Sequence, residues 1–369
     1  MANTPNPEWR IARQVIMAML FLLAGLAAAE VYVRYDDLTR YGTPLLHTPN
    51  FGSDLTVHDS LGVRGRPNGV HKKWRLNSAG FRSPESTLVL RPRCTVVAIL
   101  GASETFGYEE RAGKEYPAQL ADSLASKGCF RVINAGLTGA SLVASRQNWI
   151  LWVSRFNPAV VIVYVNPIPF VGESAPTAPL PAATPQVVST PIRPRLVDRA
   201  KDFVAFPEFV QHRRLVRMVE SLERGHEPSW FLPRVPQDRL RSFVAELDTL
   251  VSSIEAKGGR PVLVFHALRD TSLTSERARY GYEALRQFGA RARSETIVAF
   301  DSAAQQRVVA AARVAGTPLV NLRSTLSGHD ENFVDAVHFT ELGAARVAHQ
   351  VIDHVVRASQ SRVLSVRVP

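Results

Sequence analysis

The sequence has few cysteines, no zinc-finger spacing of cysteine and histidine, and no internal repeat. Only 2 of its 369 residues are cysteine, and lysine plus arginine (44) outnumber the acidic residues (33). The net charge of +11 would suit nucleic acid, but the arginines are scattered and no glycine-aromatic RNA-binding signature accompanies them. The sequence therefore disfavours a nucleic-acid partner. The basic surface suits anionic lipid headgroups or acidic glycans, or equally a solvated surface without a dedicated partner.

One uncharged apolar run lies near the N-terminus, in residues 14–29. A helix over residues 11–33, rising about 1.5 Å per residue, reaches the thickness of a bilayer. Arg10 and Arg13 precede the run, which favours a cytoplasmic N-terminus. A cleaved signal peptide is the alternative, because residues 27–29 are all alanine. We predict an uncleaved single-pass anchor in the inner membrane, with the main domain on the periplasmic or extracellular side.

Both cysteines lie just before β-branched segments that are typical of strands. Cys94 precedes residues 95–100, and Cys129 stands shortly before residues 131–134. If these strands are parallel neighbours, both sulfur atoms lie at the same edge of the sheet. An exported compartment permits a disulfide. We therefore predict a bond between the two cysteines, with two independent reduced thiols as the alternative.

The chain after residue 92 alternates between apolar segments typical of strands and amphipathic segments typical of helices. We expect strands at 95–100, 131–134, 159–165, 261–267 and 318–322. We expect helices at 116–127, 141–156, 208–224, 236–257, 275–290, 301–315 and 341–358. This alternation predicts an α/β domain with a parallel sheet and crossover helices.

The same pattern divides the chain into regions. We expect a cytoplasmic tip and transmembrane helix in 1–35, a lead-in with short strands in 36–92, the main domain in 93–360 and a tail in 361–369. Within the main domain, residues 167–207 are rich in proline and lack periodicity. We interpret that segment as an extended insertion over the surface.

The segment 101–107, Gly-Ala-Ser-Glu-Thr-Phe-Gly, follows the first predicted strand of the sheet. A serine at the carboxyl end of a strand projects where open α/β folds bind their ligands. The flanking glycines permit a tight turn and a close approach of substrate to backbone N–H groups, which can hold a developing oxyanion. Ser103 is thus a candidate nucleophile. An ordinary loop with a capping serine explains the same residues.

Asp335 and His338 lie three residues apart, just before the last predicted helix. A loop of this kind can bring both side chains to one place. The histidine would take the proton of Ser103, and the aspartate would fix its tautomer. A surface loop or a pair of metal ligands is the alternative. No third ligand has convincing spacing, so metal is the weaker interpretation.

Together these two segments resemble the SGNH/GDSL hydrolase superfamily. The nucleophile segment reads Gly-x-Ser-x-Thr-x-Gly, and the second segment reads Asp-x-x-His-Phe-Thr. The segment 134–139, Asn-Ala-Gly-Leu-Thr-Gly, resembles the second block of that family, and 77–82, Asn-Ser-Ala-Gly-Phe-Arg, resembles a segment common in its membrane-anchored members. The resemblance implies a flavodoxin-like three-layer α/β/α fold with a mainly parallel five-stranded sheet.

The resemblance also implies roles for particular residues. Ser103, Asp335 and His338 would form the catalytic triad. The backbone N–H groups of Ser103 and Gly139 would hold the oxyanion, with the side chain of Asn166 as a third donor. The sequence departs from the family pattern at two places: Ala102 stands where the family usually has aspartate, and Tyr164-Val165-Asn166-Pro167 replaces the usual Gly-x-Asn-Asp.

The function implied is an exported serine esterase or O-acyltransferase that needs neither a cofactor nor a metal. Its expected partners are the membrane and an acylated envelope or extracellular glycan, or a small ester. The alternative is a binding or scaffold protein of an envelope polysaccharide system, built on a catalytically inactive SGNH fold.

Overall fold

The structure is a computed structural model, and it describes residues 7–47, 51–59, 62–89, 94–172, 217, 220–221 and 223–365. The predicted helix at 208–224 lies almost wholly outside these residues. Of the 167–207 insertion, only the part up to Gly172 is described.

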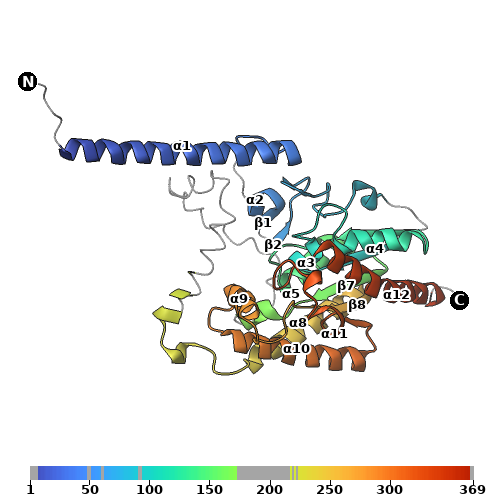
Figure 1. Cartoon of the computed structure of the whole chain (residues 1–369). Helices are drawn as coiled ribbons and strands as arrows, with labels where there is room; N and C mark the ends of the chain where they lie inside the picture. Colours follow the sequence, from blue (N-terminus) through green and yellow to red (C-terminus); the bar gives the residue numbers. More distant parts are fainter. Residues whose placement is uncertain are drawn as a thin grey trace, which may run out of the picture.

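A five-stranded parallel sheet forms the centre of the main domain (Figure 1). The strands are β5 (Thr95–Leu100), β6 (Phe130–Asn134), β7 (Val160–Val165), β8 (Arg260–Phe265) and β9 (Leu319–Asn321). Their spatial order is β6-β5-β7-β8-β9, which is the flavodoxin-like arrangement in which the chain reverses direction beside its first strand. The predicted fold class is therefore confirmed.

Both faces of the sheet are covered by helices. The main-domain helices are α3 (Ser103–Phe106), α4 (Tyr116–Ala125), α5 (Leu142–Asn148), α8 (Gln237–Ala256), α9 (Glu276–Leu285), α10 (Ser294–Ala315), α11 (Arg323–Leu326) and α12 (Glu341–Ser365). Helices α4 and α12 pack on one face, and α5, α8 and α10 on the other. Along β5, Val97 and Ile99 face the first layer while Val96, Ala98 and Leu100 face the second, as the two-residue period of a strand requires.

Short one-turn segments connect these elements. They are η1 (Glu85–Leu88), the π-helical turn η2 (Trp149–Val153), η3 (Ser154–Phe156), η4 (Ile168–Val171), η5 (Pro228–Trp230), η6 (Arg286–Phe288) and η7 (Asp330–Asn332). The predicted helix at 141–156 is thus α5 followed by a π turn and a 3-10 turn.

The lead-in before the sheet contains short elements, as predicted. They are α2 (Phe51–Leu55), β1 (Thr56–Asp59), β2 (Gly62–Gly65), β3 (Val70–His71) and β4 (Trp74–Arg75). The strands form two separate antiparallel pairs, β1 with β2 and β3 with β4.

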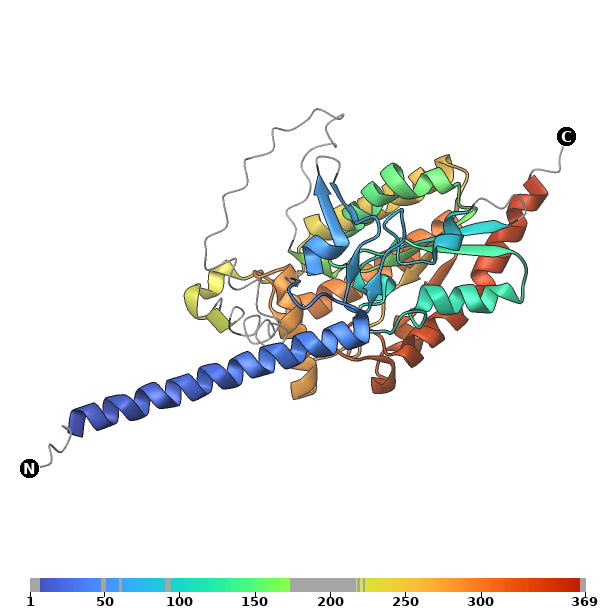
Figure 2. The ribbon, with the colours of Figure 1, turned by 90° about the horizontal axis from the view of Figure 1, so that it is seen from above.

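The N-terminal helix α1 spans Pro7–Tyr41 and points away from the main domain (Figure 2). Its segment Trp9–Tyr41 is long and apolar enough to cross a membrane, and its most apolar window is not buried against the protein. The helix continues six residues past the predicted boundary at position 35. It contains neither proline nor glycine after Gly25, and Gly42, with a φ of +71°, follows its last residue.

The structure corrects three other boundaries. The start of the predicted surface insertion is wrong, because η4 is a 3-10 turn whose Ile168 and Phe170 are buried. Helix α10 begins at Ser294 rather than 301, since Ile297 and Phe300 extend its apolar face into the core. Helix α12 continues into the predicted tail to Ser365, because no glycine or proline interrupts it after Gly343.

Candidate active site

Ser103 is the first residue of α3, directly after the carboxyl end of β5. The turn between strand and helix requires a glycine at position 101. A Cβ atom there would lie 2.1 Å from Oγ1 of Thr105 and 2.9 Å from Cβ of Tyr164. The absence of a side chain therefore lets the chain reverse tightly enough to place the hydroxyl at the top of the sheet.

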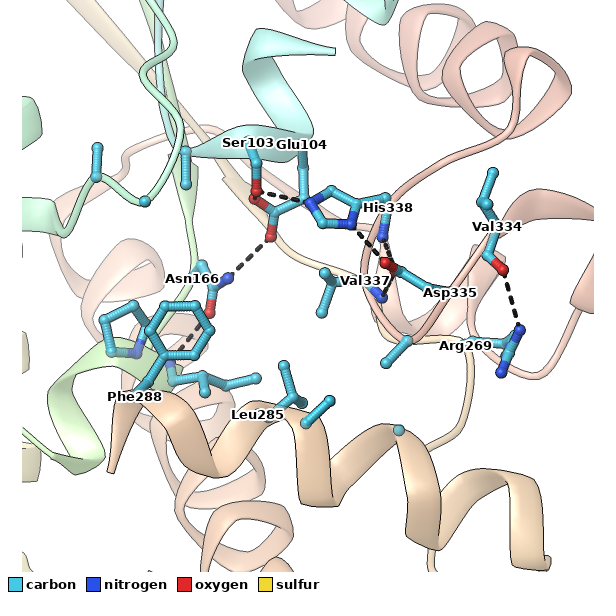
Figure 3. Close-up of a pocket in the computed structure, with 18 residues that line it drawn as sticks. Ser103, Glu104, Asn166, Arg269, Leu285, Phe288, Val334, Asp335, Val337 and His338 are labelled. Carbon is cyan, nitrogen blue, oxygen red and sulfur yellow. Dashed lines mark hydrogen bonds and ion pairs between the residues drawn. The ribbon is translucent and has the colours of Figure 1, made fainter. Parts of the chain in front are cut away.

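The loop after η7 brings His338 to Ser103 from 235 residues farther along the chain (Figure 3). Nε2 of His338 lies 2.8 Å from Oγ of Ser103. Nδ1 of His338 lies 2.7 Å from Oδ2 of Asp335. The three predicted triad residues thus form one continuous chain of hydrogen bonds, in the order that nucleophilic catalysis requires.

The triad loop is closed on itself. Oδ1 of Asp335 accepts the backbone N–H groups of Val337 (2.9 Å) and His338 (2.8 Å), and the N–H of Val334 donates to the carbonyl of His338. The buried Phe333 and Phe339 form a bridge across the base of the loop. These contacts fix the positions of Asp335 and His338 relative to each other.

The same contacts shift the pKa values of the two groups. Burial disfavours the charged forms, but the mutual hydrogen bond and opposite charges outweigh it. They lower the pKa of Asp335 to about 2 and raise the pKa of His338 to about 9. Glu104 and Glu109 add to the increase at His338. The free site therefore holds the imidazole in its protonated form at neutral pH.

A cavity of about 410 Å³ opens beside the triad. Ser103, Gly139 and Asn166 all line it, so the three residues predicted to supply oxyanion donors border the same space. Gly139 has a φ of +71°, a conformation that favours glycine. The opposite wall is apolar and includes Leu285 and Phe288 (Figure 3).

Asn166 follows β7, and both the oxygen and the nitrogen of its side-chain amide are hydrogen-bonded. Its Oδ1 accepts the N–H of Ile168 at 3.0 Å, and its Nδ2 donates to Oε1 of Glu104 at 2.8 Å. Pro167 does not displace the side chain from the cavity. The departure from the family pattern at this position thus leaves an amide beside Ser103.

Two residues that the sequence analysis did not assign also support the site. Glu104 is only 2% exposed, and its carboxylate touches both Ser103 and Asn166. Arg82, the last residue of the 77–82 segment, is buried, and its guanidinium donates to the carbonyls of Phe106, Gly107 and Glu110. Arg82 therefore holds the loop that follows Ser103. The sequence feature that could have identified Arg82 is its place in the 77–82 segment, which resembles a segment of membrane-anchored members of the family.

Two groups of side chains within the described residues have the donor types of a metal site. One is His47, Asp54 and His71, and the other is Glu109 with the triad residues Asp335 and His338. In the first group both imidazoles lie within 2.8 Å of the same oxygen, Oδ2 of Asp54, and are satisfied as hydrogen-bond donors. Neither arrangement requires a metal ion to account for its geometry.

The cysteines lie at the opposite edge of the sheet from the cavity. The structure joins Cys94 and Cys129 in a disulfide, beside the first residues of β5 and β6. This is the pairing expected from the sequence.

Comparison with known proteins gives only distant likenesses. No protein-family model matches the sequence, and neither does any curated protein. Among solved structures, a lipolytic protein of the G-D-S-L family from Desulfitobacterium hafniense is 13% identical, with a TM-score of 0.39, over 72% of this chain and 99% of that one. A lipase/acylhydrolase from Enterococcus faecalis is 13% identical, with a TM-score of 0.41, over 71% and 95%. A catalytic mutant of an acetylxylan esterase from Geobacillus stearothermophilus is 12% identical, with a TM-score of 0.39, over 72% and 95%.

Proposed function

We propose that this protein is a membrane-anchored serine hydrolase of the SGNH/GDSL type that cleaves or transfers acyl groups of esters. The observation that carries the proposal is the hydrogen-bonded series Asp335, His338 and Ser103 at the mouth of a cavity. Each side chain stands within 2.8 Å of the next, and the nucleophile lies at the carboxyl end of a parallel sheet.

In the proposed reaction Oγ of Ser103 attacks the ester carbonyl carbon while Nε2 of His338 accepts the hydroxyl proton. The oxyanion that forms is stabilised by the N–H groups of Ser103 and Gly139 and by the amide of Asn166. The ester C–O bond then breaks, and the leaving alcohol takes the proton from His338. Water or a hydroxyl acceptor attacks the acyl-enzyme by the same steps in reverse, which gives hydrolysis or acyl transfer.

The cavity wall supports an acyl group as the bound part of the substrate. Its lining beyond the triad includes Ile168, Ala284, Leu285, Phe288 and Val337. Apolar side chains of this kind stabilise a hydrocarbon chain and offer no hydrogen bonds to a sugar. In the proposed orientation the acyl chain therefore lies in the cavity, and the alcohol part lies towards its mouth.

The location of the domain supports an envelope substrate. Helix α1 is apolar over the length of a bilayer, and a disulfide in the main domain suits an oxidising compartment. We propose that the catalytic domain faces the periplasm or the exterior and acts there on acyl esters of an envelope or extracellular glycan.

Covalent labelling of the purified full-length protein with a fluorophosphonate tests this function. We expect labelling to increase between pH 7 and 10, because only neutral His338 activates the serine. Ser103→Ala should abolish labelling, and His338→Ala should lower its rate by roughly three orders of magnitude or more. Absence of labelling throughout this pH range, in a sample with a cooperative thermal transition, would favour the inactive scaffold instead.

A further inference from the structure

Glu104 places a carboxylate between the nucleophile and a predicted oxyanion donor. Its Oε1 accepts the amide N–H of Asn166 at 2.8 Å, and its Oε2 lies 3.3 Å from Oγ of Ser103 (Figure 3). The residue is 2% exposed yet lines the cavity. Two groups that the proposed reaction requires thus share one buried carboxylate.

The Ser103 hydroxyl has one proton and two acceptors. When His338 is neutral, the hydroxyl can donate to Nε2 at 2.8 Å, which is the reactive arrangement. When His338 is protonated, Nε2 donates to Oγ, and the hydroxyl proton is free to point to Oε2 of Glu104. In this second arrangement a continuous series of hydrogen bonds runs from Asp335 through His338, Ser103 and Glu104 to Asn166.

We propose that Glu104 is a positioning residue that stabilises a resting state of the site, in which it accepts the Ser103 hydroxyl and holds the Asn166 amide. Loss of the proton from His338 then returns the hydroxyl to the imidazole and makes the serine reactive. This inference rests on the proposed function, since it concerns the same nucleophile and base.

The electrostatics around His338 agree with this geometry. The ionisable or charged residues that face the imidazole or its loop are Asp335 within the loop, Glu104 on α3, Tyr108, Glu109 and Glu110 after α3, and Arg269 after β8. Burial lowers the pKa of His338, but the bond and charge of Asp335, with the charges of Glu104 and Glu109, raise it to about 9. Of these carboxylates, Glu104 is the one within reach of the serine hydroxyl.

The pH dependence of fluorophosphonate labelling, measured on the full-length protein in detergent, separates this role from simple structural support. We expect the wild-type rate to rise with pH, with its midpoint near the pKa of His338. Glu104→Gln removes the charge and presents an amide in its place, so the midpoint should move to lower pH by about one unit or more. Glu104→Asp retains the charge, and its midpoint should stay closer to that of the wild type.

Glu255→Gln is the matched control, because Glu255 is exposed near the end of α8; its midpoint should equal that of the wild type. A change in the labelling rate of Glu104→Gln without a change in its pH midpoint would overturn the proposal. Loss of a packing contact alone would give that result.

Titration of the imidazole proton of His338 by NMR provides a readout that does not depend on turnover. A lower midpoint in Glu104→Gln than in the wild type supports the inference even if neither protein reacts with the probe. Unreactive wild-type protein would contradict the proposed function alone, whereas equal titration midpoints would contradict the role of Glu104 alone.

Discussion

Among the single residues of the cavity, Asn166 is the proposed oxyanion donor whose contribution can be removed by substitution. Its side chain lines the cavity and is fixed by hydrogen bonds to Ile168 and Glu104. We expect Asn166→Ala to lower kcat for ester hydrolysis by roughly 10²-fold with a small change in KM, because an oxyanion contact forms only in the transition state. Steady-state kinetics on a short-chain nitrophenyl ester measures both constants. An unchanged kcat would assign the oxyanion to the backbone donors alone.

Glu110 is a second residue with a testable property, because the contacts of its buried carboxyl group do not fully offset the cost of burying its charge. It is 2% exposed, its Oε1 lacks a hydrogen-bond partner in the part of the chain that the structure describes, and burial raises its pKa to about 8. The unfolded chain releases this proton near pH 4.5, but the folded chain retains it to about pH 8. Its contribution to stability is therefore fully present below pH 4.5 and is lost as pH rises to 8.

Glu110→Gln should remove this loss, since an amide does not ionise. We expect the variant to gain stability relative to the wild type between pH 5 and 8, on the order of 1.4 kcal/mol per unit of the raised pKa. Denaturant unfolding at several pH values measures the difference. A constant difference between the two proteins over that range would show that Glu110 does not titrate as described.

The residues of the site differ in how far the sequence could identify them. Ser103, Asp335 and His338 stand in short motifs whose spacing and position after a strand carry chemical meaning. Glu104 stands in the same motif, but a carboxylate after a nucleophile is indistinguishable in sequence from a solvated loop residue. Its role depends on Asn166, 62 residues away, approaching within 2.8 Å. A contact of that kind appears only when the strands are assembled.

At the scale of elements, α9 forms the apolar wall that faces the triad. Ala284 and Leu285 of α9 line the cavity. We expect hexanoyl and octanoyl esters to react faster than acetyl esters. Ala284→Phe should reduce this preference by more than tenfold, because it removes the burial of about two methylenes at about 0.8 kcal/mol each. A chain-length series of nitrophenyl esters measures this, with Ala310→Phe on the exposed side of α10 as a control. A wild-type preference for acetyl esters would show that the acyl chain does not bind against α9.

The disulfide between the starts of β5 and β6 is an element-scale constraint far from the chemistry. It closes a loop with a sequence separation of 35 residues, which corresponds to roughly 3–4 kcal/mol of stabilisation in the chain-entropy account. We expect the double change Cys94→Ser with Cys129→Ser to lower the free energy of unfolding by about this amount. Labelling of Ser103 in the folded protein should continue at the wild-type rate. An unchanged unfolding midpoint would contradict the expectation.

The elements themselves were predictable to different degrees. The strands were found because buried parallel strands appear as short apolar runs, as in residues 160–165, all of which are buried. The start of α10 and the end of α12 differ from the prediction, because polar residues such as Ser294 give no clear signal for where a helix starts or stops. The burial of η4 is not predictable from the sequence, because Pro167 and Pro169 are typical of an exposed turn. The buried residues Ile168 and Phe170 each directly follow one of these prolines.

At the scale of the whole molecule, the contacts at the end of α1 connect the candidate membrane helix to the rest of the chain. Arg34 pairs with Glu30 and donates to the carbonyls of Leu45 and His47, and Arg75 of β4 donates to the carbonyl of Tyr41. The helix is thus tied to the lead-in at its C-terminal end, while its apolar part is free of the domain. If α1 spans the membrane, this arrangement predicts that the lead-in lies close to the bilayer surface.

The orientation of α1 can be tested with the full-length chain. Arg10 and Arg13 precede the apolar run, and positive charge is retained on the cytoplasmic side. Alkaline phosphatase fused after Pro369 should therefore be active, because that enzyme folds only after export. Replacing both arginines by glutamate should lower this activity severalfold, whereas the same replacement of Arg313 and Arg357, far from the span, should not.

If α1 is an uncleaved anchor, as we propose, an N-terminal tag should remain on the full-length protein in carbonate-washed membranes. A tag lost from the mature chain would identify a cleaved signal peptide, and an inactive fusion would place the triad in the cytoplasm, away from the proposed envelope esters.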